Sequence, residues 1–132
     1  MTRLFLSLVA AVLVASTALA DDIRTERVQF HKGANSATVE GTIKGYETVD
    51  YVLGARKGQS MNVSMASDNT ANYFNIIAPG KADEAMFIGS TSGNQFEGSL
   101  PASGDYKVRV YLMRSAARRD EVAKYRLEMI ID

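Results

Sequence analysis

The stretch LPASGDYKVRVYLMRSAAR, residues 100–118, decides the fold. After its first residues, four largely apolar side chains recur at every second position: Tyr106, Val108, Val110 and Leu112. Polar or charged side chains stand between them. Because successive side chains of a strand point to opposite faces, this period predicts a half-buried β-strand.

A tight corner precedes this strand, and a basic segment follows it. In the corner, Pro101 fixes one φ angle and Gly104 permits a positive φ, so Ser103 is expected at the crest of an ordered turn. Beyond the strand, Arg114 and Arg118 share a face only if their segment turns helically. We interpret residues 116–123 as a long polar loop with at most one helical turn. We expect the serine and both arginines on one edge of the molecule, where they dock into an acidic, concave partner.

Segments of the same period recur between turn signals along the chain. They are expected at 28–30, 37–43, 51–53, 61–65, 73–77, 85–88, 96–100, 106–113 and 125–131. Eight or nine short strands at this spacing are typical of an all-β sandwich or barrel. We favour a single antiparallel β-sandwich, jelly-roll-like, of about eight strands.

The first twenty residues predict export. Arg3 precedes an apolar stretch over residues 4–14, and Ala18-Leu19-Ala20 precedes Asp21. This pattern is typical of a secretory signal peptide and is too short for a membrane anchor. The chain has no cysteine, so neither lipid attachment nor disulfides are expected. We therefore predict a signal peptide over residues 1–20 and one β-sandwich domain over residues 21–132.

The charge balance excludes some partners. Removal of Arg3 leaves 14 basic residues against 15 acidic ones, which gives no reason to expect nucleic acid or an anionic membrane as a partner. The charge is uneven, because residues 105–126 hold seven basic and three acidic side chains. These cations either form a local positive field or are ordinary solvated charges.

Recognisable catalytic and metal-binding patterns are missing from the sequence. With no cysteine and the single histidine His31, expected in an exposed turn, zinc or copper would find too few ligands. Ser103 lacks the Gly-x-Ser-x-Gly setting of a nucleophile. We therefore expect no enzyme and no cofactor. A pair of carboxylates that meets only in the fold, as in a glycoside hydrolase, remains an alternative.

Four pieces of the sequence carry a resemblance. They are VEGTIKGY at residues 39–46, ARKGQ at 55–59, LPASGDY at 100–106 and RSAAR at 114–118. In this order they resemble the bacterial periplasmic inhibitors of g-type lysozyme, over about residues 28–132. The Lys-Gly-Gln turn and the Leu-Pro-Ala-Ser-Gly-x-Tyr corner also resemble the wider set of pre-peptidase C-terminal domains.

The resemblance implies a periplasmic β-sandwich whose loops enter the cleft of a g-type lysozyme. It implies that Ser103 is the inserted residue of its turn with Gly104, and that Tyr46, Arg114 and Arg118 make surrounding contacts. The chain departs from the family after Tyr46 and over residues 68–97, and its oligomeric state is left open.

The alternative is an exported sandwich module that binds a glycan or a protein without inhibiting an enzyme. Glycan sites usually present aromatic platforms. The chain has no tryptophan, and we expect most of its six tyrosines to serve the core. This argues against a glycan ligand.

Overall fold

The computed structural model describes residues 23–132. The predicted signal peptide over residues 1–20 lies outside them. Strands and two short helices follow one another as β1 (Ile23–Arg27), β2 (Ser36–Lys44), β3 (Thr48–Ala55), β4 (Ser60–Ser67), β5 (Asn72–Ile77), β6 (Ala85–Ile88), α1 (Gly89–Ser92), β7 (Gln95–Ser99), β8 (Gly104–Leu112), α2 (Arg114–Arg118) and β9 (Val122–Ile131). No helix within residues 23–132 has the length and apolar character needed to cross a membrane.

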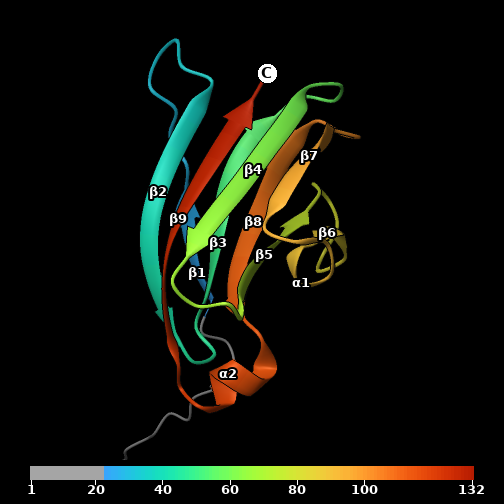
Figure 1. Cartoon of the computed structure of the whole chain (residues 1–132). Coiled ribbons are helices and arrows are strands. Elements are labelled where there is room, and N and C mark those ends of the chain that lie inside the picture. The colour runs from blue at the N-terminus through green and yellow to red at the C-terminus, as the bar shows by residue number, and fades with distance from the viewer. Residues whose placement is uncertain (1–22) are drawn as a thin grey trace, which may run out of the picture.

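The strands form two sheets packed face to face (Figure 1). The five-stranded sheet has the order β1-β3-β8-β5-β6, and the four-stranded sheet has the order β2-β9-β4-β7. This arrangement confirms the predicted all-β sandwich. It differs from a wholly antiparallel sandwich at one edge, where β1 runs parallel to β3 and Ile23 pairs with Thr48.

The first strand also begins earlier than predicted. The sequence indicated a strand at residues 28–30, but β1 spans Ile23–Arg27 and residues 28–30 follow it. All five residues of β1 are exposed, so this strand carries no alternation of buried and exposed side chains. Its position comes from pairing with β3, a long-range contact that local periodicity does not reveal.

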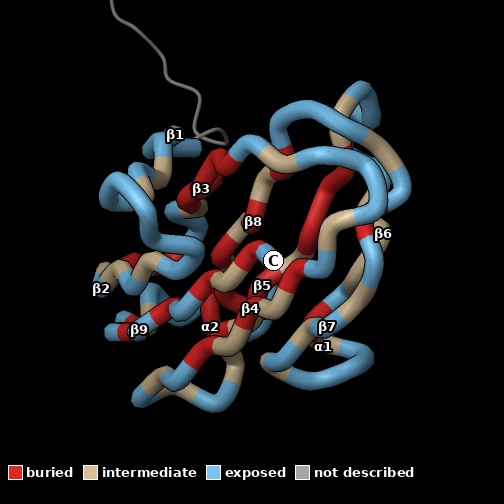
Figure 2. The backbone as a smooth tube through the Cα atoms, turned by 90° about the horizontal axis from the view of Figure 1, so that it is seen from above, coloured by how far each residue is buried: buried red, intermediate tan, exposed pale blue. Residues whose placement is uncertain are grey.

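The core lies between the sheets and is filled by the predicted alternation. In β8 the buried residues are Tyr106, Val108, Val110 and Leu112. Figure 2 shows that the buried segments lie on the central strands, whereas the loops around them are mostly exposed. Each buried side chain of this size contributes roughly 1.5–3 kcal/mol by leaving water. The fold therefore rests on burial in a chain that has no cysteine to form disulfides.

A tyrosine pair closes the core near β2. The hydroxyls of Tyr51 and Tyr125 lie 2.7 Å apart in a buried hydrogen bond. Burial raises the pKa of both phenols, because it disfavours the charged phenolate. Gly41 leaves room for them, since a Cβ there would lie 2.5 Å from the Tyr125 hydroxyl oxygen. The glycine within this alternating strand thus has a packing reason.

Candidate protein-docking site

The basic segment after β8 folds into the short helix α2. Its alanines Ala116 and Ala117 are buried against the sandwich, whereas Arg114 and Arg118 are exposed. The amide of Ala117 donates to the carbonyl oxygen of Met113 at 2.9 Å. Because the segment is helical, the two arginines four residues apart share one face, as the sequence allowed. The sequence predicts a long polar loop with at most one helical turn over residues 116–123. In the structure these residues form the end of α2, a connection over residues 119–121 and the start of β9.

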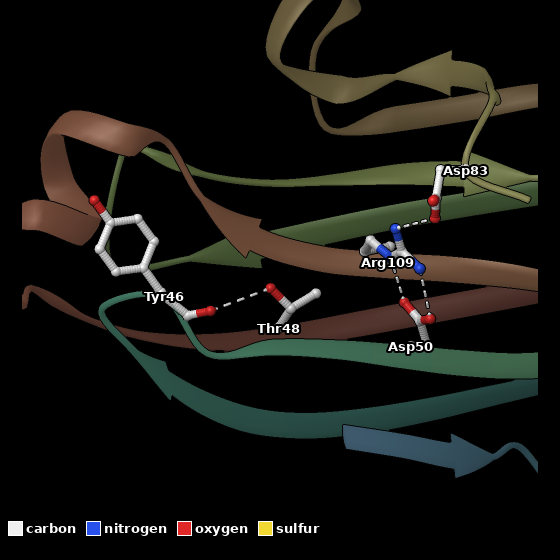
Figure 3. Close-up of polar contacts among 5 residues, drawn as sticks. All are labelled: Tyr46, Thr48, Asp50, Asp83 and Arg109. Atoms are coloured by element: carbon white, nitrogen blue, oxygen red, sulfur yellow. Dashed lines mark hydrogen bonds and ion pairs between the residues drawn. The ribbon is translucent and has the colours of Figure 1, made fainter. Parts of the chain in front are cut away.

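The turn between β2 and β3 packs against the end of α2. The amide of Gly45 donates to the carbonyl oxygen of Glu121 at 2.9 Å. Gly45 has a φ of 62°, and a Cβ there would lie 2.8 Å from Asp120 Oδ1. Only glycine fits this contact without strain. Tyr46 is therefore carried to the side of α2, where the residue is 56% exposed (Figure 3).

Ion pairing neutralises one cation of this region and leaves two available. Arg119 lies 2.7 Å from the Glu121 carboxylate, which also accepts a hydrogen bond from Asn69. The Asn69 amide, followed by Arg119, lowers the pKa of Glu121. Among residues 23–132, neither Arg114 nor Arg118 takes part in an ion pair. Their guanidinium groups are thus available to an external carboxylate.

Exposed apolar side chains gather at the same end. The large hydrophobic side chains exposed in the described part of the chain are Ile23, Tyr46, Ile88, Met113 and Val122. All but Ile88 lie in or beside the β2–β3 turn, α2 and the strand ends next to them. We call residues 44–47 and 113–122 the α2 end. Apolar side chains with accessible arginines are typical of protein-binding surfaces.

The Ser103 corner, residues 100–104, is a closed structural turn. The Ser103 hydroxyl oxygen accepts a hydrogen bond from the Lys57 amide at 2.8 Å. The Tyr106 hydroxyl donates to the carbonyl oxygen of Ala102 at 2.6 Å. Gly104 has a φ of 136°, and a Cβ there would lie 2.9 Å from Pro79 Cβ. The predicted ordered turn exists, and its polar groups largely satisfy one another.

The expectation that Ser103 and the two arginines share one edge is wrong. Strand β8 runs for nine residues between them, and at about 3.3 Å per residue it separates them by roughly 30 Å. Figure 1 shows α2 at one end of the sandwich and the start of β8 at the other. A strand carries the chain across the whole layer, so neighbours in sequence end on opposite edges. Tyr46, Arg114 and Arg118 are brought together, and Ser103 and Gly104 lie apart from them.

An ion cluster on the outer face of the five-stranded sheet was not foreseen. Arg109 donates two hydrogen bonds to the buried carboxylate of Asp50, at 2.7 and 2.9 Å, and one to Asp83 at 3.1 Å (Figure 3). The hydrogen bonds to Asp50 are the main cause that raises the pKa of Arg109. This cation of the basic segment is therefore structural. The sequence placed Arg109 on the polar face of its strand but gave no sign of its partners.

Fewer of the six tyrosines lie in the core than the sequence analysis expected. Tyr51, Tyr106 and Tyr125 are buried in the core, as predicted. Tyr46 is exposed, and Tyr73 and Tyr111 are only partly buried on the outer face of the sheet. Within residues 23–132, no group of three or more His, Cys, Asp or Glu side chains stands where it could hold a metal ion.

These features define a small β-sandwich with exposed arginines and apolar side chains gathered at one end. No family model matches the chain. It is 34% identical over 122 residues to the inhibitor of g-type lysozyme from Escherichia coli K12, covering 90% of this chain and 89% of that protein. The chain belongs to the family of g-type lysozyme inhibitors.

Solved structures agree with this assignment. The periplasmic inhibitor of g-type lysozyme from Aeromonas hydrophila matches with a TM-score of 0.78 and 42% identity, over 86% of this chain and all of that one. The Salmonella Typhimurium inhibitor matches with a TM-score of 0.66 and 34% identity, over 83% and 98%. A pre-peptidase C-terminal domain of a Bacillus anthracis collagenase shares the fold alone, at 13% identity and a TM-score of 0.55 over 88% and 100%.

Proposed function

We propose that this protein is a periplasmic inhibitor of g-type lysozyme that docks through its α2 end. The observation that carries the proposal is the gathering of Tyr46, Arg114 and Arg118 beside exposed apolar side chains, in a chain of this family. The protein has no catalytic role in this proposal. Inhibition consists of occupying the cleft where the enzyme would bind its glycan.

The chemistry of a lysozyme cleft suits this surface. Glycoside hydrolases generally work with a pair of carboxylates that flank the scissile bond. Guanidinium groups bind carboxylates through two parallel hydrogen bonds, so Arg114 and Arg118 are matched to such a site. Tyr46 and Met113 supply large side chains that exclude water around the charged contacts. Hot spots of protein interfaces are enriched in tyrosine and arginine.

The Ser103 corner has a different role in this proposal. Its hydrogen bonds to Lys57 and within residues 100–106 support a scaffold function at the far end. A single cleft that receives α2 leaves Ser103 and Gly104 outside it. We propose that they hold β8 in position and do not touch the target.

The proposal includes export of the protein to the periplasm. Cleavage after Ala20 would release residues 21–132 into the periplasm, where an incoming lysozyme meets peptidoglycan once the outer membrane is breached. The relatives from Aeromonas hydrophila and Salmonella Typhimurium are periplasmic inhibitors. Mass spectrometry of the protein from periplasmic extract should give a mature chain that begins at Asp21.

A lysozyme panel tests the function. Purified residues 21–132 are added to goose-type, chicken-type and invertebrate-type lysozymes acting on labelled peptidoglycan. We expect loss of activity for the goose type, and no release of label by the protein alone. If none of the three enzymes is inhibited, the proposal is wrong, and a sandwich module without an enzyme target becomes the better account.

A further inference from the structure

Tyr73 and Tyr111 form an aromatic pair on the outer face of the five-stranded sheet. They are register partners on β5 and β8. Their ring centroids lie 6.5 Å apart at an interplanar angle of 39°. Their chain neighbours Phe74 and Val110 are buried between the sheets, so the two tyrosines point the other way. Neither ring packs against the hydrophobic core cluster.

This pair is continuous with the α2 end. Val49 pairs with Val110, which sets Thr48 level with Tyr111 on the next strand, about 5 Å away. The Thr48 hydroxyl donates to the carbonyl oxygen of Tyr46 at 3.4 Å (Figure 3). Tyr111 also stands two residues before Met113. One surface therefore runs from the β2–β3 turn across β3, β8 and β5.

Charge distinguishes this face from the opposite face of the sandwich. On the same face, two residues before Tyr111, the charge of Arg109 is neutralised by Asp50 and Asp83. The outer face of the four-stranded sheet instead carries Lys44 and Lys124 near α2, both exposed. Lysine is depleted at protein interfaces, and tyrosine is enriched. The five-stranded sheet has its lysine on β8, Lys107, further along towards the Ser103 corner. Near α2, this sheet is therefore the face suited to a protein partner.

We infer that the surface that binds lysozyme extends from the α2 end onto the outer face of the five-stranded sheet, with Tyr73 and Tyr111 as anchors. This inference rests on the proposed function. The arginines reach into the cleft, and the tyrosine pair packs on the enzyme surface beside it. Tyrosine provides a large contact area with two rotatable angles and a polar tip, so little entropy is lost on binding.

Two threonines on either side of Gly45 give a matched test. Thr48 lies on the inferred face, and Thr42 lies three residues before Gly45 on the opposite face of the sandwich. Thr48→Arg should raise the inhibition constant for g-type lysozyme about tenfold or more, because a long cation blocks close packing there. Thr42→Arg should change it less than about twofold, since rim and off-site charges matter little. Equal effects of the two variants would overturn the inference.

Tyr73→Ala tests the anchor itself. We expect about a tenfold weaker inhibition, measured at a temperature where circular dichroism shows the variant folded. Full potency of folded Tyr73→Ala would overturn the inference. So would wild-type pelleting with insoluble peptidoglycan that Tyr73→Ala abolishes without changing inhibition, because the face would then serve a glycan.

The arginines separate this inference from the proposed function. If Arg114→Ala weakens inhibition while Thr48→Arg and Tyr73→Ala do not, the docking end is right and its extension onto the sheet is wrong. If the wild-type protein inhibits no g-type lysozyme, the proposed function fails, and the inference fails with it.

Discussion

The two ends of the sandwich are built alike and equipped differently. Each has a turn with a glycine at positive φ, Gly45 at the α2 end and Gly104 at the Ser103 corner. In the corner, the Ser103 hydroxyl and the Tyr106 hydroxyl are bonded to backbone groups of the same protein. At the α2 end, two guanidinium groups and Tyr46 face outward. An ordered turn is thus not by itself a binding site. A binding site also needs side chains that remain available to a partner molecule.

The middle of the sheet, between these ends, should show the largest effect on stability. Arg109→Met leaves the Asp50 carboxylate buried without its cation, at a cost of about 3–5 kcal/mol in the free energy of unfolding. Arg27→Met breaks the exposed pair with Asp105 on the same sheet and serves as the control. Urea denaturation should show a large loss for the first variant and little change for the second. Equal losses would contradict the structural role assigned to Arg109.

Substitutions at the two ends should differ in their effect on the inhibition of g-type lysozyme. The double variant Arg114→Ala with Arg118→Ala should weaken inhibition about 100-fold, since each lost guanidinium contact is worth about 1.4 kcal/mol or more. The matched double variant Arg56→Ala with Lys57→Ala removes two exposed cations beside the Ser103 corner. It should leave the inhibition constant within about twofold of wild type. The reverse order of effects would place the docking site at the other end.

Substitutions of Ser103 should change the stability of the protein and leave its inhibition of lysozyme unchanged. Ser103→Ala removes the acceptor of the Lys57 amide and should cost about 1 kcal/mol or less in thermal or urea unfolding. Ser103→Trp places a bulky ring on the exposed crest, and we expect unchanged inhibition of g-type lysozyme. Tenfold weaker inhibition by folded Ser103→Trp would restore the serine as an inserted residue.

The smallest expected effect is a pH dependence of the α2 end. The pKa of Glu121 is lowered in the folded protein, first by Asn69 and then by Arg119. Its contribution to stability is therefore complete above the ordinary value of 4.5 and is lost as the pH falls through the lower folded pKa. Melting temperatures between pH 7 and pH 3 should fall less steeply for Glu121→Gln than for wild type. Identical slopes would contradict this assignment.

Much of the fold could be predicted because its signal is local. The alternation from Tyr106 to Leu112 fixes which side chains enter the core, and burial confirms each of them. The all-β class and the sandwich follow from repeating that pattern. Strand β1 was not predicted, because all its residues are exposed and show no alternation with buried ones. At α2 the sequence predicted no more than one helical turn, because its five residues are too few to show a helical period.

The sequence named the residues of the proposed docking site, but their arrangement depends on the fold. Tyr46, Arg114 and Arg118 meet through the contact of Gly45 with Asp120 and Glu121, which joins distant parts of the chain. The separation of Ser103 from the arginines could have been inferred, because the predicted strand between them is long enough to span the sandwich. The partners of Arg109 could not, since Asp50 and Asp83 come from other strands and loops.

Amide hydrogen exchange of the complex with a g-type lysozyme tests the central claim most directly. Peptides that cover residues 44–48 and 112–122 should exchange more slowly in the complex than in the isolated protein. Peptides that cover residues 56–59 and 100–104 should exchange at the same rate in both. Protection of the Ser103 corner, with unchanged exchange at the α2 end, would contradict the account.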